Sequence, residues 1–327
     1  MPVDLSRTLV IGVTSSALFD MTEPNRVFEE QGLDAYTEYQ LKHANDPLPA
    51  GTGLPLVKAV LRLNEEASGN PNSTRRTDVV VASKNDPSTS ERLYHSIEHH
   101  GLDGIQRSFL VGGQPVAPYL GAFSVDLFLS TSHSDVESAL DVGIPAAVVY
   151  AAPENPTEEI DQIRIAFDGD AVLFSDESEA IYKKYGLGRF IEHETSKANV
   201  PLPEGPFFKL LKVLSFLQND PAYLERPPVR IALVTARSMP SHKRVIKTLK
   251  LWGVRVDEAF FMGGVPKTKV LSAFKPHIFF DDQDDHCQPA SVEVPTARVP
   301  NNLTDPQRQL FAERPEEVGA LARRAPR

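Results

Sequence analysis

The heptapeptide Ile165-Ala166-Phe167-Asp168-Gly169-Asp170-Ala171 is matched, 154 positions earlier in the chain, by Ile11-Gly12-Val13-Thr14-Ser15-Ser16-Ala17. Each stretch begins with an apolar run and ends in polar residues, which is typical of a buried strand whose carboxyl end opens into a site. Hydroxyl residues in the earlier stretch replace both acids of the later one. The pair predicts a repeated α/β unit in which only the second copy keeps carboxylates at the strand end.

The correspondence between the two halves extends well beyond these stretches. At the same or nearly the same spacing, Gly32-Leu33 matches Gly186-Leu187, Leu48-Pro49 matches Leu202-Pro203, Leu56-Val57-Lys58 matches Leu210-Leu211-Lys212, and Gly112-Gly113 matches Gly263-Gly264. We therefore expect two tandem domains at 1–152 and 163–300, a polar proline-containing linker at 153–162, and a C-terminal tail at 301–327.

Both halves alternate between strand and helix patterns. Strands are predicted near 8–13, 78–82, 108–111 and 126–130, and again near 163–167, 229–235, 258–262 and 277–280. Such alternation is typical of a parallel sheet covered by helices on both faces, so each domain is predicted to be Rossmann-like. The carboxyl ends of parallel strands meet at one edge, where polar residues from distant parts of the chain can gather.

Composition restricts the class of protein. The 327 residues suffice for two full cores, and the 41% hydrophobic and 24% charged content is globular. A net charge of −10 argues against non-specific binding to nucleic acid or to an anionic membrane. The single Cys287 excludes an internal disulfide, and the start of the sequence has no apolar signal segment, which together favour the cytoplasm.

Polar residues follow four of the predicted strands in the second half. In Asp168-Gly169-Asp170, one carboxylate can attack phosphorus beside a divalent metal, and the other can protonate the leaving oxygen. Alone, this motif fits a loop or a calcium-site fragment equally well. Thr235 and Lys267 can bind phosphate oxygens, with Lys269 as an alternative lysine. Asp281-Asp282 follow an apolar run, where two acids are costly unless a cation is present.

The first half lacks this entire set of polar groups. The corresponding positions are predicted to be Thr14 and Ser16, Ala82, Val116, and Ser130-Thr131. The strand hydrophobics and the glycines remain, so folding does not require the missing groups. Polar residues lost together from an intact scaffold are expected to serve one shared chemical purpose in the other copy.

The motifs Phe167-Asp168-Gly169-Asp170, Val234-Thr235, Lys267 and Phe280-Asp281-Asp282 resemble the four signatures of the haloacid dehalogenase superfamily of phosphotransferases. Nearly the whole chain, including Ser83-Lys84-Asn85-Asp86 and Leu233-Val234-Thr235-Ala236-Arg237, is similar to the cytosolic 5'-nucleotidase type I family. The resemblance implies two haloacid-dehalogenase-like domains, each with a small helical cap insertion, the first catalytically degenerate. It also implies Mg²⁺-dependent hydrolysis of nucleoside 5'-monophosphates.

Roles follow from the resemblance, position by position. Asp168 would be the nucleophile and a metal ligand, and Asp170 the acid/base, with its backbone carbonyl on the metal. Thr235 and Lys267 would hold the phosphoryl group. Asp282 would be the acidic metal ligand, with Asp281 supporting it.

Substrate contacts are expected from the loop after Thr235 and from the cap. Arg237 is a candidate for a phosphate or ribose contact, and Ala236 lies beside it. The cap is assigned to about 176–230. One of its aromatic residues could stack on the base, namely Tyr182, Tyr185, Phe190, Phe207 or Phe208, with Phe208 taken as the candidate, although cap aromatics more often form the cap's own core.

The first half, which lacks the predicted catalytic groups, has two alternative interpretations. Ser15, Lys84 and Asn85 could bind a regulatory nucleotide or help to read the base, or the half could be a purely structural partner. For the whole chain, the alternatives are a phosphatase for another small phosphoester, such as a sugar phosphate, and a nucleotide-binding regulator without activity. A homo-oligomer is compatible with the sequence.

Overall fold

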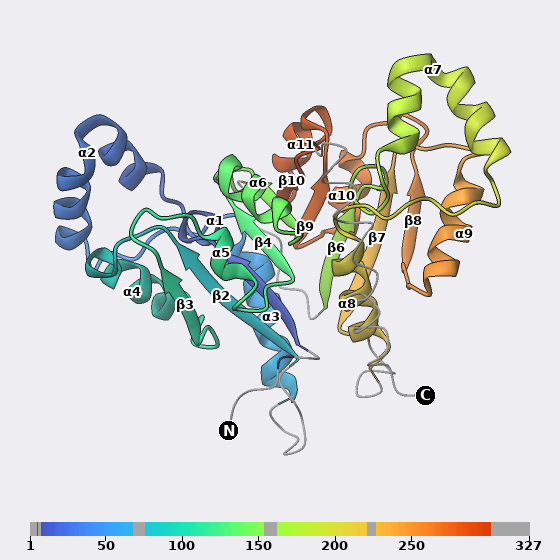
Figure 1. Cartoon of the computed structure of the whole chain (residues 1–327). Coiled ribbons are helices and arrows are strands. Elements are labelled where there is room, and N and C mark those ends of the chain that lie inside the picture. Colours follow the sequence, from blue (N-terminus) through green and yellow to red (C-terminus); the bar gives the residue numbers. More distant parts are fainter. Residues whose placement is uncertain (1–4, 6–7, 68–75, 154–161, 221–226, 302–327) are drawn as a thin grey trace.

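The computed structural model is an α/β protein built on one ten-stranded sheet, in the order β3-β2-β1-β4-β5-β10-β9-β6-β7-β8 (Figure 1). The structure describes residue 5 and residues 8–67, 76–153, 162–220 and 227–301. Most of the predicted linker at 153–162, and the predicted tail from residue 302 onward, therefore lie outside the described residues.

The first half contains the following elements: β1 (Leu9–Val13), α1 (Ser15–Leu18), α2 (Thr22–Lys42), α3 (Leu54–Ala67), β2 (Thr77–Ser83), a 3₁₀ helix (Pro87–Thr89), α4 (Glu91–His99), β3 (Arg107–Leu110), α5 (Ala117–Leu120), β4 (Leu127–Ser130), α6 (His133–Asp141) and β5 (Ala146–Val149). The second half contains β6 (Ile163–Phe167), α7 (Glu177–Ser196), α8 (Phe208–Gln218), β7 (Val229–Thr235), α9 (His242–Trp252), β8 (Glu258–Phe261), α10 (Thr268–Phe274), β9 (Ile278–Asp281), α11 (Asp284–Ser291) and β10 (Thr296–Arg298). All eight predicted strands are confirmed.

Two short strands that were not predicted join the halves. β5 and β10 pair antiparallel, with Val149 opposite Ala297 and Val148 opposite Arg298. Every other neighbouring pair of strands is parallel. The two halves therefore form one continuous sheet, and not two separate sheets.

Alternation along the strands separates the core into layers. In β6, Ile163, Ile165 and Phe167 belong to a large apolar cluster that also includes side chains of α3 and α8. Ala166 points to the opposite face, where it packs with residues of α10 and α11. The period of two is the strand signature, and it places helices on both faces of the sheet.

The path of the chain creates a switch point beside β6. This strand pairs with β7 on one side and β9 on the other, both parallel. The chain runs outward from β6 through β7 to β8 and then returns to β9. Connections leave in opposite directions at such a point, which is where open α/β sheets place their ligands.

The predicted cap at 176–230 contains two helices with different surroundings. α8 lies against the sheet, because Leu210, Leu211 and Leu214 are buried in the main apolar cluster. α7 instead projects from the sheet at the end opposite to α2 (Figure 1). Both α2 and α7 are interrupted by a glycine in the left-handed region, Gly32 with φ 84° and Gly186 with φ 76°, where a side chain would be strained.

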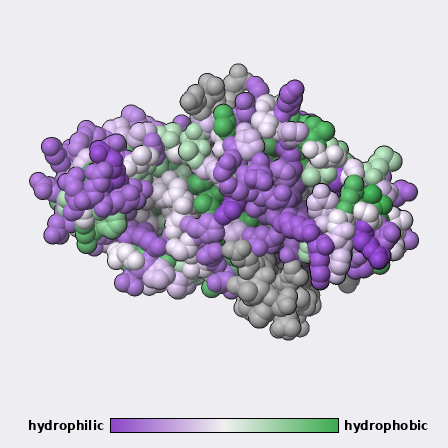
Figure 2. All heavy atoms as spheres, turned by 90° about the horizontal axis from the view of Figure 1, so that it is seen from above, coloured by the Kyte–Doolittle hydropathy of each residue, from purple (hydrophilic) through white to green (hydrophobic). Residues whose placement is uncertain are grey.

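Polar atoms dominate the face seen in Figure 2, and its hydrophobic atoms occur in small separate groups. In the described part of the chain, none of the helices combines the length and the apolar character that a membrane crossing requires.

Candidate active site at the ends of β6 and β9

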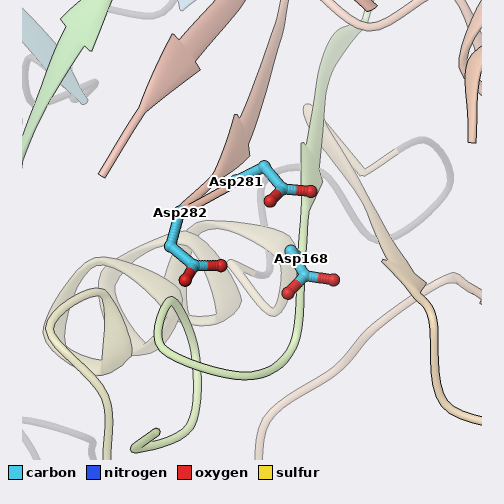
Figure 3. A group of neighbouring side chains, drawn as sticks. All are labelled: Asp168, Asp281 and Asp282. Atoms are coloured by element: carbon cyan, nitrogen blue, oxygen red, sulfur yellow. The ribbon is translucent and has the colours of Figure 1, made fainter. Parts of the chain in front are cut away.

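Three carboxylates converge at the switch point (Figure 3). Asp168 directly follows β6, and its backbone N–H donates to the carbonyl oxygen of Phe280 at 2.8 Å, which ties it to β9. Asp281 ends β9, and Asp282 follows it. One ligand oxygen from each of the three lies within 4.8 Å of the others, and all three residues are buried. The structure thus brings together Asp168 and Asp282, the two carboxylates predicted to bind the metal, with Asp281 beside them.

Lys267 places a buried positive charge among these acids. It is the residue before α10, and its Nζ donates to Oδ1 of Asp168 and to Oδ2 of Asp281, each at 2.6 Å. Burial opposes the charge on the ammonium, but the two carboxylates outweigh burial and raise the pKa of Lys267. The lysine therefore stays protonated and can bind an anion such as phosphate.

Negative charge at the site still exceeds positive charge. Burial, together with repulsion from Asp281 and Asp170, raises the pKa of Asp168 to about 7. Burial, together with repulsion from Asp168 and Glu179, raises the pKa of Asp282 to about 9. Among the described residues, Oδ1 of Asp282 is buried without a hydrogen-bond partner. An all-oxygen set with an unpartnered carboxylate oxygen fits a hard divalent cation such as Mg²⁺.

We expect the contribution of Asp168 and Asp282 to the stability of the metal-free protein to fall as the pH rises from about 4 to about 9. Asp168 and Asp282 have folded pKa values above the 3.8 of an ordinary aspartate, so the folded state binds their protons more tightly. Their contribution is complete below 3.8 and disappears as the pH passes about 7 and about 9. A divalent cation replaces those protons. The increase in Tm on adding Mg²⁺ in place of EDTA should therefore be larger at pH 8.5 than at pH 6.

The variant Asp282→Asn provides the matched comparison. The amide needs no proton, whereas the buried carboxyl of Asp282, with its pKa of about 9, must keep a proton that the unfolded chain releases, so at pH 8.5 without metal the variant should be more stable than the wild type by about 1–3 kcal/mol. The Mg²⁺-dependent increase in Tm should largely disappear. An undiminished increase in the variant would show that Mg²⁺ acts elsewhere.

Thr235 and Gly169 fit together at the end of β7. The Thr235 side chain is buried, and its Oγ1 accepts a hydrogen bond from the backbone N–H of Arg237 at 3.3 Å. A Cβ atom at Gly169 would lie 3.3 Å from that Oγ1. The glycine therefore allows the loop after β6 to pass close to the threonine hydroxyl. Ala236 occupies the loop between Thr235 and Arg237, as predicted from its position in the sequence.

Asp170 lies two residues after Asp168 in the sequence, and its side chain is held by Arg237. The guanidinium donates through Nε to Oδ2 of Asp170 at 2.7 Å and through Nη2 to Oδ1 at 2.6 Å. Its Nη1 donates to Oε2 of Glu194, on α7, at 2.5 Å. Arg237, predicted as a substrate contact, thus has two carboxylate partners within the protein.

Phe208 is placed in the core. Its side chain is 4% exposed, and its ring lies 4.7 Å from that of Trp252. A buried aromatic on α8 has no free face to offer a nucleotide base.

Two acidic residues on α7 were missed by sequence reasoning. Glu194 is fully buried between Arg237 and Arg244. Glu179, also buried, accepts from Lys183 at 2.6 Å and from Gln283 at 3.1 Å, and it is one of the charges that raise the pKa of Asp282. The sequence carries one signal that could have identified them: an acidic residue at a position that the helix pattern assigns to the buried face.

The register of the strands corrects one predicted correspondence. Val13 lies opposite Val81, and Phe167 lies opposite Leu233. The first-half counterpart of Thr235 is therefore Ser83, and not Ala82. The backbone supports this, since Oγ of Ser83 accepts from the N–H of Asn85 at 3.1 Å, as Thr235 does from Arg237. The prediction of Ala82 was wrong by one residue, a shift that exchanges the two faces of a strand.

The first-half candidates for ligand contact have partners within the protein. Oγ of Ser15 lies 3.1 Å from Oγ of Ser83. Nζ of Lys84 lies 2.6 Å from Oδ1 of Asp135. Oδ1 of Asn85 accepts from the hydroxyl of Tyr36, on α2, at 3.4 Å. No carboxylate corresponds to Asp168 or Asp282, because Thr14 and Thr131 occupy those places.

Known proteins are similar to this chain over most of its length. A family model described as 5'-nucleotidase matches residues 1–306. Human cytosolic 5'-nucleotidase 1B is 38% identical over 294 residues, which make up 88% of this chain and 48% of that protein. The chain thus spans about half the length of the curated relative that it matches. Given the extent of both matches, the chain belongs to the 5'-nucleotidase family.

Proposed function

We propose that the protein is a Mg²⁺-dependent 5'-nucleotidase that hydrolyses nucleoside 5'-monophosphates to nucleoside and phosphate. The observation that carries the proposal is the convergence of Asp168, Asp281 and Asp282 at the switch point, with Lys267 donating to two of them. Family membership supplies the class of substrate.

Each residue of the site has a distinct part in the proposed reaction. A carboxylate oxygen of Asp168 attacks phosphorus, and the bond from phosphorus to the nucleoside 5'-oxygen breaks, which gives an aspartyl phosphate. Asp170 donates a proton to the departing oxygen and later accepts one from the water that hydrolyses the acyl phosphate. Thr235 and Lys267 hold the phosphoryl oxygens. Asp168 and Asp282, with the backbone carbonyl of Asp170, would hold Mg²⁺, which neutralises charge on the phosphate.

We assign the first half to a catalytically degenerate copy of the second, with boundaries at 1–152 and 163–300. The strand orders β3-β2-β1-β4-β5 and β8-β7-β6-β9-β10 correspond one to one. Left-handed glycines also recur, Gly112 and Gly113 in one half and Gly263 and Gly264 in the other. Under this assignment Thr14, Ser83, Val116 and Ser130 occupy the places of catalytic groups. Regulation by a nucleotide bound at Ser15, Lys84 and Asn85 stays a prediction.

The choice of leaving group separates the proposal from its alternative, a phosphatase for sugar phosphates or similar esters. We expect kcat/KM for at least one nucleoside 5'-monophosphate to exceed that for every sugar phosphate tested by about tenfold or more. The reason is that base and ribose contacts add binding free energy, and about 1.4 kcal/mol corresponds to a tenfold difference in kcat/KM. Released phosphate should be measured with both groups of esters at equal Mg²⁺. A preference for sugar phosphates would establish the alternative.

A further inference from the structure

Arg237 makes a doubly hydrogen-bonded contact to Asp170. Two guanidinium nitrogens meet the two carboxylate oxygens at 2.7 and 2.6 Å, and the arginine side chain is 2% exposed. A fork of this kind fixes both the position and the orientation of a carboxylate, which a single point charge does not do.

Residues of α7 hold the arginine in turn. Oε2 of Glu194 accepts from Nη1 of Arg237 at 2.5 Å, and the guanidinium lies 5.6 Å from the ring centre of Phe190. The other oxygen of Glu194 accepts from Arg244 at 2.9 Å and from Ser178 at 2.8 Å. Every oxygen of this buried carboxylate is therefore satisfied. The arrangement connects α7 to Asp170 through Arg237.

The first half provides an internal comparison for this network. Arg92 donates through Nε to the carbonyl oxygen of Asp46 at 2.8 Å, just as Arg244 does to that of Val200 at 2.8 Å. Gln40 takes the place of Glu194 and accepts from Arg92 at 3.3 Å. This outer part of the network therefore occurs in both halves and serves the fold.

The inner, charged part of the network occurs in only one half. Asn85 corresponds to Arg237, because its N–H contacts the hydroxyl of Ser83 as that of Arg237 contacts Thr235. Ser16 corresponds to Asp170. In the first half the hydroxyl of Tyr36 joins these two neutral residues, because it donates to Asn85 at 3.4 Å and accepts from Gln40 at 2.9 Å. A neutral asparagine, tyrosine and glutamine thus attach α2, so attachment of a helix does not require the Arg237–Glu194 ion pair.

We propose that Arg237 is a positioning residue, held by Glu194, that orients the carboxyl group of Asp170 toward the leaving 5'-oxygen and does not itself contact the phosphate or the ribose. The inference rests on the proposed function. It also assigns to α7 a part in catalysis, because the residues that fix Arg237 belong to that helix.

A double-mutant cycle tests the role of Arg237. The variant Arg237→Asn/Glu194→Gln installs two of the three neutral groups that the first half accommodates, and Phe190→Tyr, present in every protein of the cycle, supplies the bridging hydroxyl and protects folding. With a nucleoside 5'-monophosphate, we expect kcat to fall about 10–100-fold, with KM changed less than about threefold. In a background of Asp170→Asn the same pair of changes should have almost no further effect, because no carboxyl group remains to be oriented.

The matched control is Gln40→Ala, which alters the equivalent helix position far from the acids and should leave kcat unchanged. If the losses from Asp170→Asn and from the Arg237/Glu194 pair multiply, or if KM rises in both backgrounds, Arg237 contacts the substrate and the proposal is wrong. An increase in kcat would mean that Arg237 restrains Asp170, which also overturns it. A wild-type protein that hydrolyses no nucleoside monophosphate would instead remove the proposed function.

Discussion

Replacing Asp168 with asparagine is expected to lower kcat for nucleoside 5'-monophosphates by at least about 10⁴-fold. The amide is isosteric but cannot form the acyl phosphate, and it also removes a charge from the metal site. Asp168 is 4% exposed, and its backbone is anchored to β9, so the substitution should leave the loop in place. Released phosphate, measured over hours with the variant and seconds with the wild type, gives the ratio.

The first half supplies the control for this substitution. Thr14 occupies the corresponding position, and its hydroxyl caps α1 by accepting from the N–H of Ala17 at 3.2 Å. Asparagine is also a good N-cap residue, so Thr14→Asn should fold normally and keep full activity. Acid quenching during turnover of ³²P-labelled substrate should label the wild-type protein and not Asp168→Asn. Residual activity of the Asp168 variant above about 1% of the wild type would exclude this residue as the nucleophile.

The strands and the main acidic site could be predicted because their signals are local. A short, mainly apolar run such as Ile163–Phe167 is typical of a buried strand, and a charged residue directly after it is then expected at the sheet edge. Parallel pairing then collects Asp168 and Asp282 at that edge, whatever the intervening sequence. The repeat strengthened this reasoning, because the same positions in the first half are uncharged.

What could not be predicted depends on how elements approach one another. β5 and β10 unite the sheet by pairing antiparallel, and nothing in either short stretch of sequence specifies which distant strand its edge will meet. The error at Ala82 arose because sequence spacing alone does not specify register, and Ser83 is one residue further on. Glu194 lies 24 residues beyond Asp170, and only the path of α7 brings its carboxylate to Arg237.

Lys267→Val is expected to have the largest effect on stability. The lysine is buried between Asp168 and Asp281, so its removal leaves the Asp168 carboxylate without a cation, while Asp281 keeps the backbone N–H of Gln283 and the ring of His286 as partners. Breaking a buried pair in this way costs about 3–5 kcal/mol of unfolding free energy. Because Lys267 is proposed to hold the phosphoryl group, its loss should also lower kcat by about 10²–10³-fold. Urea denaturation in EDTA, with phosphate release measured in parallel, gives both values.

The first half indicates how that stability can be recovered. Val116 occupies the place of Lys267 and is 1% exposed, while Thr14 and Ser130 take the places of Asp168 and Asp281. The triple variant Asp168→Thr/Lys267→Val/Asp281→Ser reproduces that set. Its unfolding free energy in EDTA should return to within about 1 kcal/mol of the wild-type value, because replacing all members of a buried ionic group is often neutral. It should have no activity. A triple variant as unstable as Lys267→Val would mean that lost packing around the lysine stem, and not the unpaired Asp168 carboxylate, causes the destabilisation.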